Sequence, residues 1–205
     1  MIFVVVRAVV LAAGASSRMG RPKAGLPLSN RSDTFLSRIL RTLAMAGLPQ
    51  IVVVTGSAPE AVRAAAGRVR RNVSFAHNER WATGQLTSLL AGLQDRRGDV
   101  IEAALVALVD APLASVETIA EVVRTWRRTR APIVRPARGD VHGHPVVFDR
   151  VVFEELRSAD PRLGAKSIVR ARARDIVNVP IDDAGAFIDI DTEQEYYDAL
   201  RELRH

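Results

Sequence analysis

The sequence predicts an α/β fold with a mostly parallel sheet. Apolar, β-branched runs alternate with helical patterns along the chain, as in a sheet whose strands are joined by crossover helices. Two runs, Ile2–Leu11 and Ala103–Val109, are apolar almost throughout, which is typical of strands buried on both faces. Hydrophobic residues make up 48% of the 205, so a sizeable core is available. Because we find no repeat or linker, we expect a single domain over residues 1–205.

Local signals place the elements of the first half. After the first strand and a polar loop, Thr34 can cap a helix that closes at Gly47. Proline favours the first turn of a helix, so a second helix is expected from Pro59 to Ala66. Leucines at helical spacing predict a third helix, Gln85–Leu93. The strands expected between these helices are Ile51–Thr55 and Val73–Ala76.

The elements of the second half follow from similar signals. Ser115 can cap a helix that turns Ile119 and Trp126 inward. Thr192 and Glu195 have the spacing of a capping box, which predicts a closing helix through Leu203. The other expected elements are a strand pair, Ile133–Ala137 and Pro145–Phe148, around the turn Arg138–Asp140, two short helices, Val151–Leu156 and Ala165–Arg172, and a last strand, Ile176–Ile181.

Composition narrows the classes of function. The net charge of +6 comes from arginines spread along the chain and aromatic residues amount to only 5%, so we expect no nucleic-acid partner. The absence of cysteine excludes disulfides and thiolate metal sites and is compatible with the cytoplasm, where we expect the protein. The N-terminal apolar run contains Arg7, is too short for a membrane span and lacks the features of a signal peptide, so we expect no membrane partner.

A polar loop with small residues follows the first strand. Small residues let a backbone approach a ligand closely, and successive N–H groups in such turns bind anions. Arg18 and Lys23 add a planar fork and a compact point charge. Since open α/β sheets bind ligands at the carboxyl ends of their strands, we interpret this loop as a triphosphate cradle. The residues expected to contact the nucleotide here are Leu11, Ala12, Ala13, Gly14, Ser16 and Gly20.

Two common glycine loops do not match this segment. A P-loop has four residues between its glycines, whereas five separate Gly14 from Gly20, and a dinucleotide fingerprint needs a glycine where Ser16 stands. The string Leu-Ala-Ala-Gly-Ala-Ser-Ser-Arg-Met-Gly-Arg-Pro-Lys instead resembles the signature of nucleotidyltransferases similar to molybdenum cofactor cytidylyltransferase. The resemblance implies a three-layer α/β/α sandwich of the nucleotide-diphospho-sugar transferase type, which is Rossmann-like. It also implies catalytic roles for Arg18 and Lys23.

Asp110 and Asp191 are the candidate metal ligands. Asp110 ends an apolar run, and from chemistry alone its carboxylate can either hold Mg²⁺ or accept hydrogen bonds as a loop cap. The family has a metal-binding aspartate in a similar Asp-x-Pro pattern, which implies a metal-binding and catalytic role for Asp110. The family's Asp-Ile-Asp-Thr pattern implies that Asp191 is a second ligand, with helix capping as the alternative. Asp189 shares a face with Asp191 in an extended segment.

Three further segments resemble family motifs. Asn78–Leu93 resembles the stretch that faces the base and ribose, and backbone N–H groups at its helix start suit negative charge. Gly143–Phe148 resembles an acceptor loop, although His142 stands where the family has arginine, and Leu163–Lys166 resembles a second acceptor segment with lysine for arginine. The implied nucleotide contacts are Asn78, Gly84, Gln85 and Ser88, and the implied acceptor contacts are His144, Pro145 and Lys166.

Together these motifs imply a Mg²⁺-dependent nucleotidyltransferase. A phosphate oxygen of the acceptor attacks the α-phosphorus of a nucleoside triphosphate, and pyrophosphate leaves. The Leu-Ala-Ala-Gly start resembles the cytidylyl branch, so CTP is the expected donor and molybdopterin the expected acceptor, with a molybdoenzyme or its chaperone among the partners to test. Two alternatives stay open: a sugar-phosphate or other small-phosphate nucleotidyltransferase, and a non-catalytic nucleotide- or cofactor-binding module.

Overall fold

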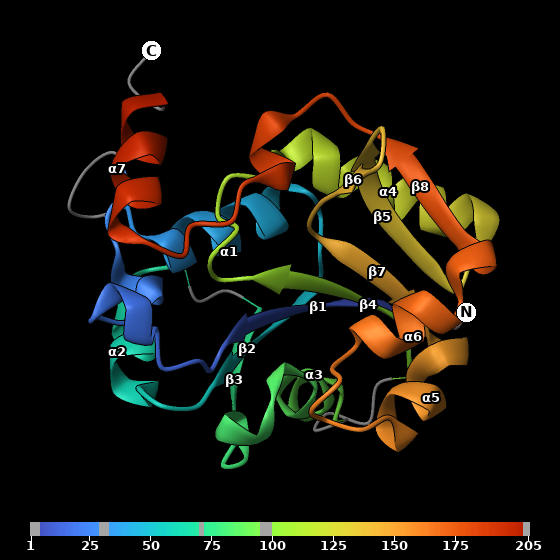
Figure 1. Cartoon of the computed structure of the whole chain (residues 1–205), viewed down its shortest axis with the longest axis horizontal. Coiled ribbons are helices and arrows are strands. Elements are labelled where there is room, and N and C mark those ends of the chain that lie inside the picture. The colour runs from blue at the N-terminus through green and yellow to red at the C-terminus, as the bar shows by residue number, and fades with distance from the viewer. Residues whose placement is uncertain (1–4, 29–32, 70–71, 95–99, 203–205) are drawn as a thin grey trace.

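The fold is built around a sheet with the strand order β3-β2-β1-β4-β7-β5-β6, in which β8 pairs with β5 (Figure 1). The computed structural model describes residues 5–28, 33–69, 72–94 and 100–202. The β1–β2, β2–β3, β1–β4 and β5–β8 pairs are parallel, whereas β7 runs antiparallel to both of its neighbours and β6 antiparallel to β5. The strands are β1 (Val5–Ala12), β2 (Gln50–Thr55), β3 (Val73–His77), β4 (Ile101–Leu108), β5 (Ile133–Arg138), β6 (Val141–His142), β7 (Val146–Asp149) and β8 (Ile176–Pro180).

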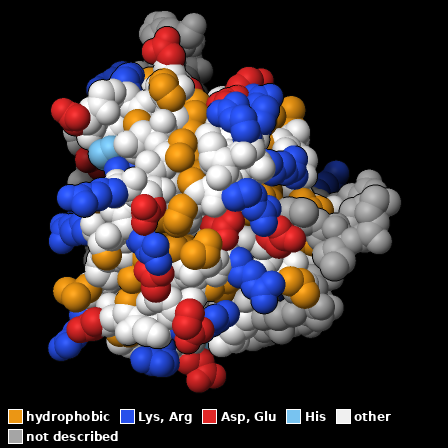
Figure 2. All heavy atoms as spheres, turned by 90° about the vertical axis from the view of Figure 1, so that its right-hand side faces the viewer, with side chains coloured by type: hydrophobic (Ala, Val, Ile, Leu, Met, Phe, Trp, Pro, Cys, Tyr) orange, Lys and Arg blue, Asp and Glu red, His pale blue; other side chains and the backbone are white. Residues whose placement is uncertain are grey.

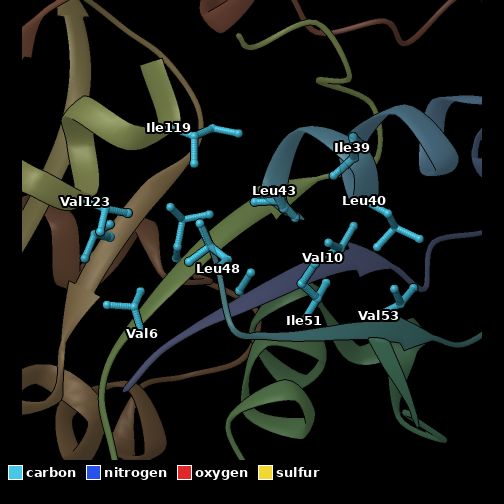
Figure 3. Packing of buried hydrophobic residues seen from close by; sticks show 14 of the residues in the cluster. Val6, Val10, Ile39, Leu40, Leu43, Leu48, Ile51, Val53, Ile119 and Val123 are labelled. Carbon is cyan, nitrogen blue, oxygen red and sulfur yellow. The ribbon is translucent and has the colours of Figure 1, made fainter. Parts of the chain in front are cut away.

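Helices cover both faces of this sheet, so the predicted α/β/α sandwich is confirmed. Alternate residues of β1 enter two separate cores, because successive side chains of a strand point to opposite faces. One core lies beneath α1 (Phe35–Met45), α2 (Pro59–Ala65) and α4 (Val116–Thr129). Figure 3 shows α1 and α4 residues of this core meeting Val6 and Val10 of β1. The opposite core is covered by α3 (Gln85–Leu93), α5 (Phe153–Ser158) and α6 (Lys166–Ala171).

The predicted caps and turns explain most element boundaries. The Thr34 side chain caps α1 in a capping box with Ser37, and Ser115 Oγ accepts a hydrogen bond from the Thr118 N–H at the start of α4 (3.1 Å). The predicted strand pair is confirmed, because β5 and β7 pair antiparallel, although the turn after Arg138 joins β5 to the short strand β6, which precedes β7 in the chain. Where one helix is predicted from Val151, a 3₁₀ turn precedes α5. The predicted starts and ends at Ile2 and Leu203 lie outside the described residues.

A further helix, α7 (Glu193–Glu202), packs on the loop that follows β1 rather than on the sheet. Tyr196 is its anchor: the ring is buried beside Phe35, and the hydroxyl donates to the Pro27 carbonyl (2.7 Å). Six short 3₁₀ helices complete the secondary structure of the described ranges: Ser17–Met19, Lys23–Gly25, Trp81–Thr83, Arg150–Val152, Ala173–Asp175 and Ala184–Phe187.

Surface charge is mixed on the side of the molecule shown in Figure 2, where blue and red side chains alternate. The positive net charge is therefore not gathered into one patch on this side. Within the described ranges, no helix is both long enough and apolar enough to cross a bilayer.

Gly92 sets the close approach of α3 to the sheet, and its replacement by alanine is expected to destabilise the protein. A Cβ at this position would lie 2.4 Å from Val9 Cγ1 and 3.1 Å from Val54 Cγ2. Overpacking of this kind costs about 1–3 kcal/mol, or a fall in Tm of roughly 2–4 °C per kcal/mol for a chain of this size. Thermal unfolding checks this, with Gly25→Ala as the control because no atom lies within 4 Å of its built Cβ. Equal Tm values for the two variants would contradict this packing argument.

Candidate active site

Two short 3₁₀ turns shape the loop after β1. Ser16 adopts a left-handed backbone conformation (φ 52°), and the first turn closes at Gly20, where φ is 62°. The second turn begins at Lys23. Ser16 Oγ accepts a hydrogen bond from the Lys23 N–H (3.2 Å), which ties the two turns together. The loop thereby holds the Lys23 ammonium at the carboxyl ends of the central strands.

The Lys23 side chain lies between the two predicted metal ligands. Its Nζ donates to Asp110 Oδ2 (3.2 Å) and to Asp191 Oδ1, and Arg18 Nη2 lies 2.9 Å from Asp191 Oδ2. Lys23 is only 8% exposed at the side chain, whereas the two carboxylates are about 30% exposed. The Lys23 hydrogen bond holds the pKa of Asp191 below its ordinary value, against the opposing effect of burial. The site is therefore a compact group of two basic and two acidic side chains.

Backbone contacts bring these distant carboxylates together. Asp110 lies in the turn after β4, and Asp191 lies just before α7. The Ile190 N–H donates to the Asp110 carbonyl (2.7 Å), so the two segments are joined directly beside their acidic side chains. Packing of Ile190 and Tyr196 on the β1 loop fixes the same segment from the other side. The meeting of Asp110 and Asp191 thus depends on the docking of α7.

A cavity of about 270 Å³ opens beside this charged group. Its polar and charged walls suit a phosphate chain, and Trp81 adds an aromatic surface that also packs against the core under α3. Gly56 leaves room for this ring, since a Cβ there would lie 2.7 Å from Trp81 Cγ. The sequence-predicted residues in its lining are Leu11, Ala12, Ala13, Gly14, Ser16, Arg18, Lys23, Gln85, Ser88, Asp110 and Asp191.

Asn78 and Gly20, predicted as nucleotide contacts, do not line this cavity. Asn78 is 6% exposed, and its amide donates to Thr87 Oγ1 (2.8 Å) and Ser88 Oγ (2.9 Å). Its carbonyl oxygen accepts from the Arg80 N–H (3.0 Å), so both amide hydrogens and the oxygen are engaged within the protein around the start of α3. Asn78 therefore positions Ser88 instead of facing the cavity. Gly84 lines a second cavity.

The second cavity has a volume of about 490 Å³ and shares Leu11 and Gln85 with the first. The predicted acceptor residues His144 and Lys166 line it, together with Asp189. Burial lowers the pKa of His144, although the charges of Asp189 and Asp110 oppose this effect. Burial raises the pKa of Asp189, with His144 opposing and Asp110 contributing. The two cavities adjoin at Leu11 and Gln85, which line both of them.

Pro145 is the predicted acceptor residue that the structure places elsewhere. It follows a cis peptide bond with His144 and lines a separate cavity of about 20 Å³ beneath α1. Arg135 lines the second cavity as well, although no sequence motif identified it as a site residue. The available signal was a single charged residue within the apolar run Ile133–Ala137.

Glu195→Ala is expected to lower Tm by weakening the capping box that holds Asp191. Glu195 Oε2 accepts from the backbone N–H groups of Asp191 and Thr192 (both 2.8 Å), and these bonds hold the pKa of Glu195 below its ordinary value. A lowered pKa stabilises the folded state above the unfolded pKa of about 4.3, and this contribution is lost as pH falls through the folded value. The difference in Tm from wild type should therefore narrow below about pH 4.

Glu193→Ala is the matched control for Glu195→Ala, because Glu193 is also exposed in the first turn of α7 and its side chain has no hydrogen-bond partner among the described residues. Thermal unfolding between pH 3 and pH 8 gives the comparison. If both substitutions lowered Tm equally at all pH values, the loss of a negative charge from the first turn of α7, and not the loss of the capping box, would explain the lower Tm.

Comparison with known proteins gives a consistent family signal. A MobA-like NTP transferase domain model matches residues 8–176. A Paenarthrobacter nicotinovorans protein named nicotine blue oxidoreductase is 31% identical over 204 residues, which cover 95% of this chain and 96% of that protein. A Rhodopirellula baltica protein named "Probable molybdenum cofactor guanylyltransferase" is 32% identical over 192 residues, which cover 85% and 88%.

Solved structures share the fold over the whole chain. The crystal structure of Rv0371c from Mycobacterium tuberculosis H37Rv is 28% identical with a TM-score of 0.80, covering 98% of this chain and all of that one (100%). Its complex with manganese is 27% identical with a TM-score of 0.76, covering 97% and 98%.

Proposed function

The chain belongs to the MobA-like NTP transferase family and is a nucleotidyltransferase, and on that basis we propose that it transfers a nucleoside monophosphate to the phosphate of a molybdopterin-type acceptor. The observation that carries this proposal is the Lys23–Asp110–Asp191 group at the wall of the first cavity. The shared wall between the two cavities supports it, because donor and acceptor must meet at one phosphorus atom.

The chain's own residues act by position and charge. An acceptor phosphate oxygen bonds to the α-phosphorus while the bond to the bridging oxygen of the β-phosphate breaks, and pyrophosphate leaves with that electron pair. Arg18 and Lys23 stabilise the charge that develops on the phosphate oxygens, and the loop N–H groups around Gly14 hold the leaving group. Gln85 and Ser88 orient the nucleoside end of the donor. No protein nucleophile is required.

A divalent cation fits the carboxylate pair. Asp110 and Asp191 contact the same ammonium, so their oxygens converge on one point, and carboxylate oxygen is the donor that Mg²⁺ and Mn²⁺ prefer. In the described part of the chain, no group of three or more acidic or histidine side chains could enclose a metal, so phosphate oxygens and water would complete its ligands. When bound, the cation neutralises phosphate charge. The related Rv0371c forms a complex with manganese, which supports this class of ion.

The identity of the base is the point on which the relatives and the signature differ. The Leu-Ala-Ala-Gly start favours CTP, whereas relatives at 30–32% identity are named as guanylyltransferases. We expect acceptor-dependent pyrophosphate release when the purified protein is given molybdopterin, Mg²⁺ or Mn²⁺ and either GTP or CTP. The higher kcat/KM identifies the donor. Absence of acceptor-dependent release with all four nucleoside triphosphates contradicts the proposal.

A second candidate function comes from the relative named nicotine blue oxidoreductase, which matches nearly the whole chain. On this reading the second cavity, with its aromatic and aliphatic lining, binds a heteroaromatic substrate that is reduced. Loss of the colour of nicotine blue, with a reduced nicotinamide nucleotide as the electron donor, tests this activity separately. Dye reduction without any nucleotidyl transfer would favour this candidate over the first.

A further inference from the structure

Arg135 is a half-buried charged residue on the sheet face that packs against the core beneath α5 and α6. The pairs Ile133↔Phe148 and Val134↔Val147 show that alternate β5 residues face opposite cores. Arg135 therefore shares the face of Ile133 and Phe148, beneath α5 and α6. Burial lowers its pKa below the ordinary arginine value. Because Arg135 is only half-buried, its stem can pack on this core while the guanidinium stays accessible to a ligand.

The Arg135 guanidinium is oriented but not neutralised. Its Nε donates to Asn178 Oδ1 (2.9 Å), and Asn178 is its direct neighbour in the parallel β5–β8 pair. Within the described ranges no carboxylate forms an ion pair with it, and its terminal amino groups have no hydrogen-bond partner. By contrast, Arg162 in the same cavity is paired with Asp160 (2.8 Å). Arg135 thus presents a fixed fork of unused donors, which suits an oxyanion.

The other residues that line the second cavity indicate the charge of this anion and the kind of group that carries it. Lys166 is a second cation of the lining that has no ion pair among the described residues. His142, which replaces the arginine of the acceptor motif, lies close enough to Arg135 for that charge to lower its pKa in addition to burial. Two unneutralised cations suit the double charge of a phosphate. The apolar part of the lining suits a flat ring and includes Leu86, Leu89, Val106, Val146, Phe148 and Val169.

We propose that Arg135 is an acceptor-binding residue whose guanidinium, positioned by Asn178, binds a phosphate group carried on an apolar ring. The assignment of the ligand as the acceptor rests on the proposed function, whereas binding of the phosphate does not. Asn178 is a positioning residue, since it fixes Nε and leaves the terminal amino groups for the ligand.

Phenyl phosphate is the test probe because it joins a phosphate to a flat apolar ring. We expect isothermal titration calorimetry to give a Kd about tenfold weaker for Arg135→Met than for wild type, with Arg135→Lys in between. Arg170→Met is the matched control: it removes the same charge from α6, does not line the cavity and should leave Kd unchanged. Absence of binding to wild type, or equal Kd values for wild type and Arg135→Met, overturns the proposal.

Turnover separates this proposal from the proposed function. With molybdopterin as acceptor, Arg135→Met should raise the acceptor KM about tenfold and leave the KM of the nucleoside triphosphate unchanged. If wild type shows no nucleotidyl transfer while phenyl phosphate still discriminates Arg135→Met from Arg170→Met, the phosphate site stands and the proposed function fails. If Arg135→Met raised only the KM of the nucleoside triphosphate, Arg135 would bind the nucleotide donor and not the acceptor, which overturns the assignment.

Discussion

Lys23→Met is expected to lower kcat by about 10²–10³, the usual cost of removing one preorganised donor from a transition state. In the free protein the ammonium contacts both carboxylates and is almost fully buried, so it is held ready beside the phosphate cavity. Methionine keeps most of the stem volume and removes the charge. Because the carboxylates remain partly exposed to water, the fold should survive the change.

The same substitution has a second expected effect that activity alone would not reveal. In the free protein the ammonium competes with a divalent cation for the carboxylate oxygens, so Lys23→Met should bind Mn²⁺ more tightly than wild type, measured by titration in the absence of nucleotide. Lys166→Met removes the chain's other lysine and should instead raise the acceptor KM. Unchanged kcat together with weaker Mn²⁺ binding in Lys23→Met would contradict both roles.

Local sequence signals predicted the bounds of helices and strands better than they predicted which strands pair in the sheet. Leucine spacing gave the observed bounds of α3, and the Thr34 cap begins α1. The β5–β7 pair was predicted, whereas the placement of β7 beside β4 depends on pairs such as Val106↔Val146, which join segments distant in sequence. Periodicity carries no information on such partners. A local exception is Val151, whose N–H binds the Asp149 side chain (3.0 Å) and begins a 3₁₀ turn.

Sequence motifs predicted which residues belong to the candidate site, but they did not predict the contacts that those side chains make. Motifs selected Lys23, Asp110 and Asp191, which the structure brings together. They assigned Lys23 to phosphate alone, because an ion pair across the chain leaves no local pattern. Asn78 shows the reverse: its motif suggested ligand contact, whereas its amide is used inside the protein.

Asp110→Asn is expected to lower turnover by about 10³ or more, since a carboxylate that holds a divalent cation accounts for several kcal/mol of transition-state charge stabilisation. Asparagine has the same shape, and the backbone bond from Ile190 to the residue 110 carbonyl does not depend on the side chain. The fold and the docking of α7 should therefore persist, and Tm should change little. Mn²⁺ affinity, measured without nucleotide, should fall together with kcat.

Asp191→Asn should have the same double effect, because both carboxylates converge on one point beside Lys23. Asp182→Asn removes an equal charge from an exposed position between β8 and α7 and should change neither quantity. If Asp110→Asn loses turnover but binds Mn²⁺ as wild type does, Asp110 acts by holding the Lys23 ammonium and not as a metal ligand. If it loses neither, the carboxylate pair is not the reaction centre, because a site that needs this charge cannot tolerate its removal.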